Sequence, residues 1–234
     1  MKTLYLECNM GAAGDMLMAA LYELLEDKQG FLDTMNHLRL PGVHLEAQPA
    51  STCGIAGTHM AVTVHGQEET EPAAPEATGQ DHLHHHGEEH HHHDHEHEHD
   101  HGHEHGHEHH HDHDHGEEHH HHHHHATPGH IGAIIDSLPL PEEVKTHARS
   151  VYDAIAQAEA KAHGCPVGDV HFHEVGALDA VADVVGVCYA LYLLQPEQIL
   201  ASPVHVGSGT VRCAHGIMPV PAPATANLLS GVPI

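Results

Sequence analysis

The chain has 234 residues, in which only 7 Lys and Arg oppose 34 Asp and Glu, so the formal net charge is −27 with neutral histidines. Nucleic acid and anionic membranes are poor partners for such a chain, because both attract clustered positive charge. Five cysteines without a CxxC pair argue against a disulfide framework. The longest uncharged apolar run, Val184–Leu194, is too short to cross a bilayer, and the first residues do not read as a signal peptide. We therefore expect a reduced, cytoplasmic protein.

Residues 1–66 are predicted to form a small β-α-β-β unit. Leu4, Leu6 and Cys8 alternate with Thr3, Tyr5 and Glu7, as in a half-buried strand. A glycine turn follows, and Asp15 is a candidate N-cap for the first helix. The remaining pattern predicts helices over Met16–Leu25 and Phe31–Leu38, and strands over Val43–Ala47 and Met60–Val64.

Residues 67–126 are predicted to be a disordered metal-binding segment rich in His, Asp and Glu. There are 27 histidines between His82 and His125, and every odd-numbered residue from His95 to His115 is His. Such a run offers almost no apolar surface for a core, but imidazole is a good ligand for nickel, zinc and copper. We expect Ni²⁺ to bind histidines such as His95, His97, His99 and His101. The alternatives are an internal expression tag or a linker that only buffers charge.

Residues 127–234 are predicted to form a helix-rich α/β unit, so the whole chain is expected to have a mixed α/β (α+β) fold. Apolar residues recur at helical spacing over Val144–Ala162, and Gly164 should end that helix. The other predicted elements are helices over Ile131–Leu138 and Leu178–Leu194, strands over Ile199–Val206 and Thr210–Cys213, and a short last helix starting at Pro223. The apolar ending 231–234 suggests packing against a further segment or subunit, or into the chain's own core.

The stretch from His171 to Asp183 is the richest in chemistry. His171 and His173 would share one side of an extended segment, about 7 Å apart. Asp179 and Asp183, four residues apart on a helix, would share one face. Together with Glu174 they make a credible divalent-metal site. The alternative is that the histidines are polar residues at a strand end and Asp179 is a first-turn residue favoured by the helix dipole. A buried Asp183, however, needs a partner or a metal.

Residues 207–216 are a second candidate site. Gly207 and Gly209 allow close backbone approach to a ligand, and Arg212 could bind its phosphate or carboxylate. Cys213 and His215, on one side of a strand, could add metal ligands. A tight turn with a surface Arg and a buried thiol explains the pattern about as well.

The turn from Gly11 through Gly14 to Asp15 is a third and weaker candidate. It joins a strand to a helix, and backbone amides at a helix N-terminus favour anions. It matches neither a dinucleotide-binding nor a Walker A pattern. A plain turn with a capping Asp is the alternative.

Three motifs together resemble the nickel-insertion protein family of the lactate-racemase cofactor pathway. They are GAAGDM at 11–16, HFHEVGALD at 171–179 and HGIMPVPAPAT at 215–225. In that family a histidine-rich segment also lies between the first and second motifs. The resemblance covers nearly all of the chain outside the histidine-rich segment.

The resemblance implies a CTP-dependent nickel chelatase of the lyase class. Its substrate is pyridinium bisthiocarboxylic acid mononucleotide, and its product is a nickel-pincer nucleotide with two Ni–S bonds and one Ni–C bond. The Ni–C bond requires loss of a ring proton, so a base is expected near the metal. The candidates are, for catalysis, His173, Glu174 and Asp179; for metal binding, His171, His173, Glu174, Asp179, Asp183 and His215; and for substrate or cofactor binding, Gly11, Gly14, Asp15, Gly207, Gly209 and Arg212. The resemblance does not assign these individual roles, which the chemistry of each side chain suggests.

Two departures from the family pattern limit this carry-over. The family commonly has hydroxyl side chains in its first motif, where this chain has Asn9-Met10 and Ala12-Ala13. Family members also continue beyond a position like Ile234, and CTP, with Mg²⁺ or Mn²⁺, is expected only in the full-length protein. We therefore expect this chain to bind nickel and to supply part of the substrate site, without running the CTP-dependent reaction alone.

The expected partners are nickel, the pyridinium nucleotide, the C-terminal portion of the same family, and apo lactate racemase or a related nickel-pincer enzyme. Neither a nucleic acid nor a membrane is expected as a partner. The sequence leaves open whether the chain forms a homo-oligomer. The alternative function is a non-catalytic nickel store or metallochaperone. A metal-dependent hydrolase with the same ligands is a third, less favoured reading.

Overall fold

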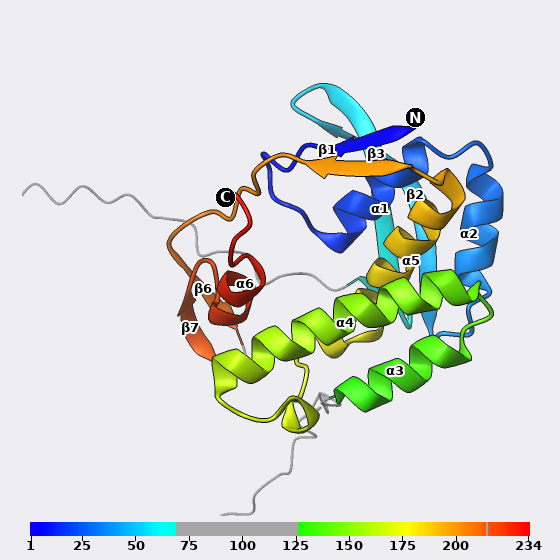
Figure 1. Ribbon diagram of the computed structural model, residues 1–234. Helices are drawn as coiled ribbons and strands as arrows, with labels where there is room; N and C mark the ends of the chain where they lie inside the picture. Colours follow the sequence, from blue (N-terminus) through cyan, green and yellow to red (C-terminus); the bar gives the residue numbers. More distant parts are fainter. Residues whose placement is uncertain (69–125, 214) are drawn as a thin grey trace, which may run out of the picture. The chain divides into compact units, whose positions relative to one another are not determined.

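The computed structural model describes residues 1–68, 126–213 and 215–234. The predicted metal-binding histidines His95, His97, His99 and His101 lie outside these residues. The described residues belong to one compact unit, formed by Met1–Glu71 and His123–Ile234. They contain helices and small sheets, which confirms the mixed α/β class (Figure 1). The elements are β1 (Thr3–Leu6), α1 (Gly14–Glu23), α2 (Lys28–Asn36), β2 (Val43–Thr52), β3 (Ile55–Val64), β4 (Gln67–Glu68), α3 (Pro128–Ser137), α4 (Glu142–His163), η1 (Val167–Asp169), η2 (Glu174–Gly176), α5 (Leu178–Leu194), β5 (Gln198–Ala201), β6 (Thr210–Cys213), β7 (Gly216–Pro219) and α6 (Pro223–Leu228).

The first part of the chain forms the predicted strand, two helices and two further strands, β2 and β3, which are longer than predicted. The prediction that Asp15 caps α1 is wrong: Ala13 is the N-cap residue, with no side-chain cap bond, and Asp15 lies in the first turn. An Asp there is still favoured by the helix dipole. α2 is capped by Asp27, whose carboxylate accepts from the Gly30 N–H at 2.8 Å.

The largest sheet is the antiparallel hairpin of β2 and β3, with β4 at its edge. Its strands pair from Val43 opposite Val64 to Thr52 opposite Ile55. The two-residue turn is Cys53-Gly54, and both residues have positive φ, which matches the right-handed twist of the strands. β3 packs against α1, so the hairpin covers one side of that helix.

β1 pairs in parallel with β5, so the partner of the first strand comes from beyond the histidine-rich segment. The strand predicted over Ile199–Val206 ends early, at Ala201. Pro203 follows, and a proline has no N–H to give to a ladder. The chain nevertheless continues beside the β1 end, because the His205 N–H donates to the Cys8 carbonyl at 3.0 Å.

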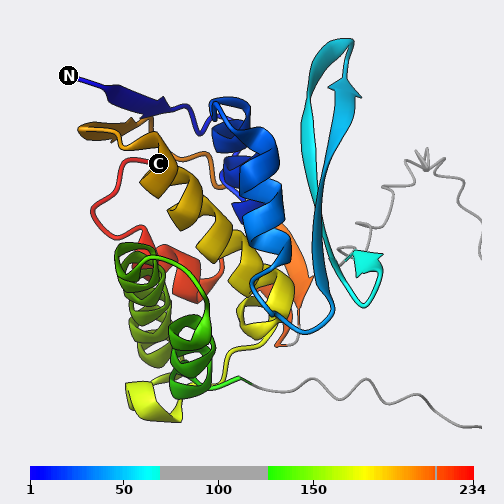
Figure 2. The same cartoon turned by 90° about the vertical axis from the view of Figure 1, so that its right-hand side faces the viewer.

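α5 is the centre of the packing, in contact with α1 on one side and α4 on the other (Figure 2). Its bounds match the prediction, and Val181, Ala182 and Val185 are fully buried. A Cβ added at Gly186 would lie 2.3 Å from the sulfur of Met18, so the absent side chain is what lets α1 come this close.

α4 buries part of the apolar face that its periodicity predicted, including Val144 and Ala148, but Val151 is exposed and Tyr152 and Ala156 are buried instead. The helix ends at Gly164, which has φ +65°. α6 packs against α4, and the Asn227 side-chain amide donates to the Ala158 carbonyl at 3.1 Å. Within 1–68, 126–213 and 215–234, we find no helix of the length and apolarity that a bilayer span needs.

Candidate functional site

The HFHE turn is anchored at its phenylalanine. Phe172 is 1% exposed, its N–H donates to the Ala126 carbonyl at 2.8 Å, and its ring packs on Tyr152 with centroids 5.7 Å apart. The Tyr152 hydroxyl donates in turn to the Val175 carbonyl at 3.1 Å. On either side of this buried anchor His171 is exposed and His173 is half-buried, so the turn holds both imidazoles near the surface.

Carboxylates from the first motif and from the first two turns of α5 meet where α1 begins against α5. We call Asp15, Asp179 and Asp183 the carboxylate group. The backbone N–H of Asp15 donates to the Asp183 side chain, and the charges of Asp15 and Asp179 both act on it. A Cβ added at Gly14 would lie 2.6 Å from the Asp183 Cβ and 2.7 Å from its Oδ2. The glycine therefore makes room for the Asp183 carboxyl.

The carboxyl of Asp183 has a strongly raised pKa. Burial, and then the neighbouring charges of Asp15 and Asp179, raise its pKa from 3.8 to about 7, and the Asp15 N–H lowers it by less. Its Oδ1 is buried without a hydrogen-bond partner among the described atoms. Burial and the charges of Asp179 and Asp183 also raise the pKa of Tyr152. A carboxyl in this state can take a proton or a cation near neutral pH.

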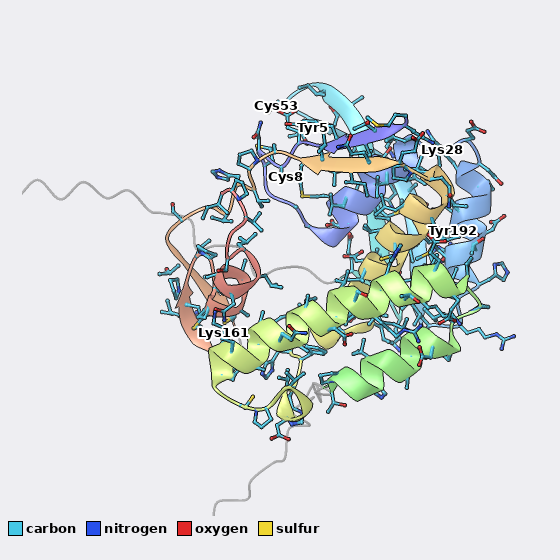
Figure 3. All side chains as sticks on the ribbon, in the orientation of Figure 1. Tyr5, Cys8, Lys28, Cys53, Lys161 and Tyr192 are labelled. Atoms are coloured by element: carbon cyan, nitrogen blue, oxygen red, sulfur yellow. The ribbon has the colours of Figure 1, made fainter. Side chains whose placement is uncertain are left out.

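Three imidazoles gather at the C-terminal end of α4. His215, which follows β6, lies with its ring centroid 4.9 Å from that of His163 and 4.7 Å from that of His173. Lys161, labelled in Figure 3, marks this end of α4. We call these three residues the imidazole group. The structure thus joins two predicted ligands, His173 and His215. His163 was missed, because the sequence shows it only as a polar residue in the last turn of a long helix.

The glycine turn that starts at Gly11 lies next to the segment that leads into the 207–209 loop. A Cβ added at Gly11 would lie 3.6 Å from the His205 carbonyl oxygen, and one added at Gly207 would lie 3.6 Å from Val220. Both glycines, and Gly209, have positive φ. Arg212 lies on β6 and is exposed. The proposed anion-binding role of these residues stays a prediction.

The predicted metal ligands do not converge on one point as they stand. Among the residues that the structure describes, no group of three or more His, Cys, Asp or Glu side chains is arranged to hold a metal ion. His171, His173 and Glu174 each engage a neighbour. The catalytic and metal-binding roles of these side chains therefore remain predictions.

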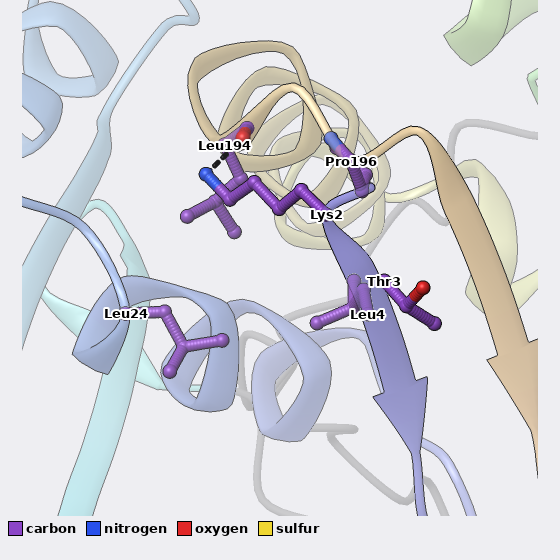
Figure 4. A pocket seen from close by; sticks show the side chains of 6 residues that line it. All are labelled: Lys2, Thr3, Leu4, Leu24, Leu194 and Pro196. Atoms are coloured by element: carbon purple, nitrogen blue, oxygen red, sulfur yellow. Dashed lines mark hydrogen bonds between the residues drawn. The ribbon is translucent and has the colours of Figure 1, made fainter.

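A cavity of about 220 Å³ lies elsewhere, at the C-terminal end of α5 (Figure 4). It is lined by Lys2, Thr3, Leu4, Leu24, Leu194 and Pro196. The Lys2 ammonium donates to the Leu194 carbonyl and so satisfies one of the last carbonyls of the helix. This cavity is about 17 Å along the helix axis from Asp183 and contains none of the predicted site residues.

Comparison with known proteins identifies the chain's family. The family model described as nickel insertion protein matches residues 4–234, so the chain belongs to the nickel insertion protein family, as the three motifs predicted. It is 42% identical, over its full length, to the pyridinium-3,5-bisthiocarboxylic acid mononucleotide nickel insertion protein of Clostridium acetobutylicum, of which it covers 51%. The proteins of the same name from Lactiplantibacillus plantarum and Geobacillus kaustophilus are 39% and 35% identical over 99% and 100% of the chain, which covers 47% and 46% of them.

The chain thus spans about half the length of the curated relatives it matches. No solved structure matches it.

Proposed function

We propose that this chain is the nickel-handling half of an enzyme that inserts Ni²⁺ into pyridinium-3,5-bisthiocarboxylic acid mononucleotide. The relatives carry this activity in their names. The observation that supports it here is the contact of the first family motif with Asp183 of α5, four residues beyond the second motif, where Gly14 and the Asp15 N–H cradle a carboxyl with a raised pKa. The nickel is a substrate of this reaction, and the imidazoles are the side chains best suited to receive it.

The chemistry requires a proton acceptor. When nickel replaces a ring hydrogen, the electron pair of the C–H bond becomes the Ni–C bond and the proton must leave. A general base works best when its pKa lies near the operating pH. Asp183, with a pKa of about 7, is matched to this task, and Asp15 and Asp179 help to hold it there. Asp183 thus takes the proton, while His173 and His215 hold the ion; His171, Glu174 and Asp179 stay candidates for either role.

The glycine turn before α1 and the 207–209 loop are the two candidates for binding the phosphate or a carboxylate of the nucleotide. Because the Asp15 N–H already donates to Asp183, the start of α1 presents a carboxylate where a phosphate would have to approach. Arg212 and the 207–209 loop are therefore the better candidates for the phosphate or a carboxylate of the nucleotide. CTP, with Mg²⁺ or Mn²⁺, is expected to act through the part of the relatives that this chain does not span. The whole enzyme would be a lyase-class chelatase that serves apo lactate racemase or a related nickel-pincer enzyme.

The test is an insertion assay. The chain is joined to the second half of the Clostridium acetobutylicum relative and supplied with Ni²⁺, CTP, Mg²⁺ and the nucleotide, and the product is followed by mass and absorbance. Asp183→Asn should lower the rate by about 10²–10⁴-fold, the usual contribution of a general base. Asp153→Asn, an exposed carboxylate on α4, is the matched control. An unchanged rate for Asp183→Asn would remove Asp183 from the mechanism.

The same assay tests the division of labour. The isolated chain should bind nickel and yield no product with CTP. Product from the isolated chain would show that this half suffices. Nickel binding by the isolated chain, with no product from the joined protein, would favour a nickel store instead.

A further inference from the structure

His163 completes a set of three imidazoles that come from three separate segments. It lies in the last turn of α4, whereas His173 precedes η2 and His215 precedes β7. Its side chain is 42% exposed. His215 lies between the other two rings, 4.9 Å from one and 4.7 Å from the other. An exposed cluster of this kind can admit an ion from solvent.

The spacing of the rings is that of imidazoles sharing one ion. A histidine nitrogen lies about 2.0–2.1 Å from a ligated divalent ion and the ring centre about 1.1 Å behind it, so two such rings at about 90–109° have centroids about 4.5–5.1 Å apart. Both centroid distances from His215 fall in this range. The His215 ring therefore already lies at ligand spacing from each of the other two rings.

The ring orientations are what differ from a metal site. His173 meets His215 edge-on, with an interplanar angle of 90°, and the nitrogens do not converge on one point. The χ2 torsion of histidine is broad and roughly two-fold. Rotation about it turns a nitrogen towards an ion without moving the backbone. An ion that binds this group has to reorient rings and does not have to refold the chain.

Glu159 adds an orienting contact. Its carboxylate lies 3.5 Å from the Nε2 of His163, one helical turn earlier on α4. A slight approach of the two side chains would let the Nε2–H donate to this carboxylate, and Nδ1 would then be the nitrogen that faces the ion. Glu159 is therefore a positioning residue for His163.

We propose that His163, His173 and His215 form a three-imidazole site for a divalent d-block ion, which is Ni²⁺ in this protein. The choice of nickel rests on the proposed function. Three protein ligands leave coordination positions open. The sulfur atoms of the nucleotide can enter these positions before the imidazoles leave, so the site hands the ion over instead of storing it.

The test measures unfolding of the full chain at buffered free Ni²⁺, followed by circular dichroism in guanidinium chloride. An ion that binds native and unfolded chains alike does not shift the unfolding midpoint, whereas an ion bound only by a folded site raises it. The wild type should show such a rise. His163→Ala should weaken the apparent nickel affinity by more than about 100-fold, and Glu159→Gln by about 10–100-fold. His147→Ala, exposed on the same helix, is the control and should behave as the wild type.

The outcomes separate this site from the proposed function. Each variant must match the wild-type midpoint in EDTA, which shows that it folds. Loss of the nickel-dependent rise in His163→Ala, His173→Ala and His215→Ala alike supports the site. A rise lost in His173→Ala and kept in His163→Ala refutes it and leaves the nickel function standing. No rise in the wild type refutes it too, while the role of Asp183 is still decided by the insertion assay.

Discussion

Replacing Asp183 by Asn should change how the stability of this protein depends on pH. In the folded chain the pKa of Asp183 is about 7, against an ordinary value of 3.8, because the carboxyl is buried beside Asp15 and Asp179. Folding therefore takes up a proton between those two pH values. The folded state is favoured most below the lower value, and its stability falls as the pH rises towards 7, by about 1.4 kcal/mol per pH unit for one proton.

Between pH 5 and pH 8, ionisation of this carboxyl should lower the unfolding free energy of the wild type by up to about 2.7 kcal/mol. Allowing for solvent screening reduces this figure to about 2 kcal/mol. Asp183→Asn keeps the shape of the side chain and cannot ionise. Between pH 5 and pH 8, the unfolding free energy of the variant should therefore rise relative to that of the wild type by about 2 kcal/mol. The assay is guanidinium denaturation at both pH values in EDTA. Histidines that titrate alike in both proteins cancel in the difference.

The result that would refute this reasoning is a parallel pH dependence in the two proteins. It would mean that Asp183 is ionised in the folded state, with its charge stabilised by contacts that outweigh burial. Asp153→Asn, on the exposed face of α4, should run parallel to the wild type in any case and so controls for the loss of one charge.

Three further substitutions test the framework around the site. Gly14→Ala should cost about 1–3 kcal/mol of unfolding free energy and flatten the pH dependence, because its Cβ must displace the Asp183 side chain; an unchanged pH profile would contradict the cradle. Tyr152→Phe should cost about 0.5–1.5 kcal/mol, since it removes the hydroxyl that donates to the HFHE turn, and equal stability in urea would show that this bond is dispensable. Gly164→Ala should cost about 1–2 kcal/mol by calorimetry, because Gly164 ends α4 with φ +65°. Gly168→Ala, which meets nothing within 4 Å and has no positive φ, should cost less than Gly164→Ala.

The helices were predictable because their signals are local. The apolar spacing over Val144–Ala162 and the glycine after it gave α4 nearly to its ends, and the apolar stretch before Gln195 gave α5 at its bounds. Strand ends were less predictable. The strand after Ile199 stops at Ala201, since a short edge depends on its partner, here β1, and not on its own pattern.

The candidate site was predictable only in part. The composition and motifs of the chain named the metal, the family and most of the candidate residues, because imidazoles and carboxylates reveal their chemistry by type. They could not show that Gly14 makes room for Asp183, or that His163 reaches His215.

Those two meetings join residues far apart in the chain. The first exists because α5 packs closely on α1 at Gly186, and the second because His215, between β6 and β7, lies against the last turn of α4. Side-chain chemistry is a property of each residue and can be read in order along the chain. Proximity is set by how whole helices pack, and that decided which carboxyl became hard to ionise and which imidazoles became neighbours.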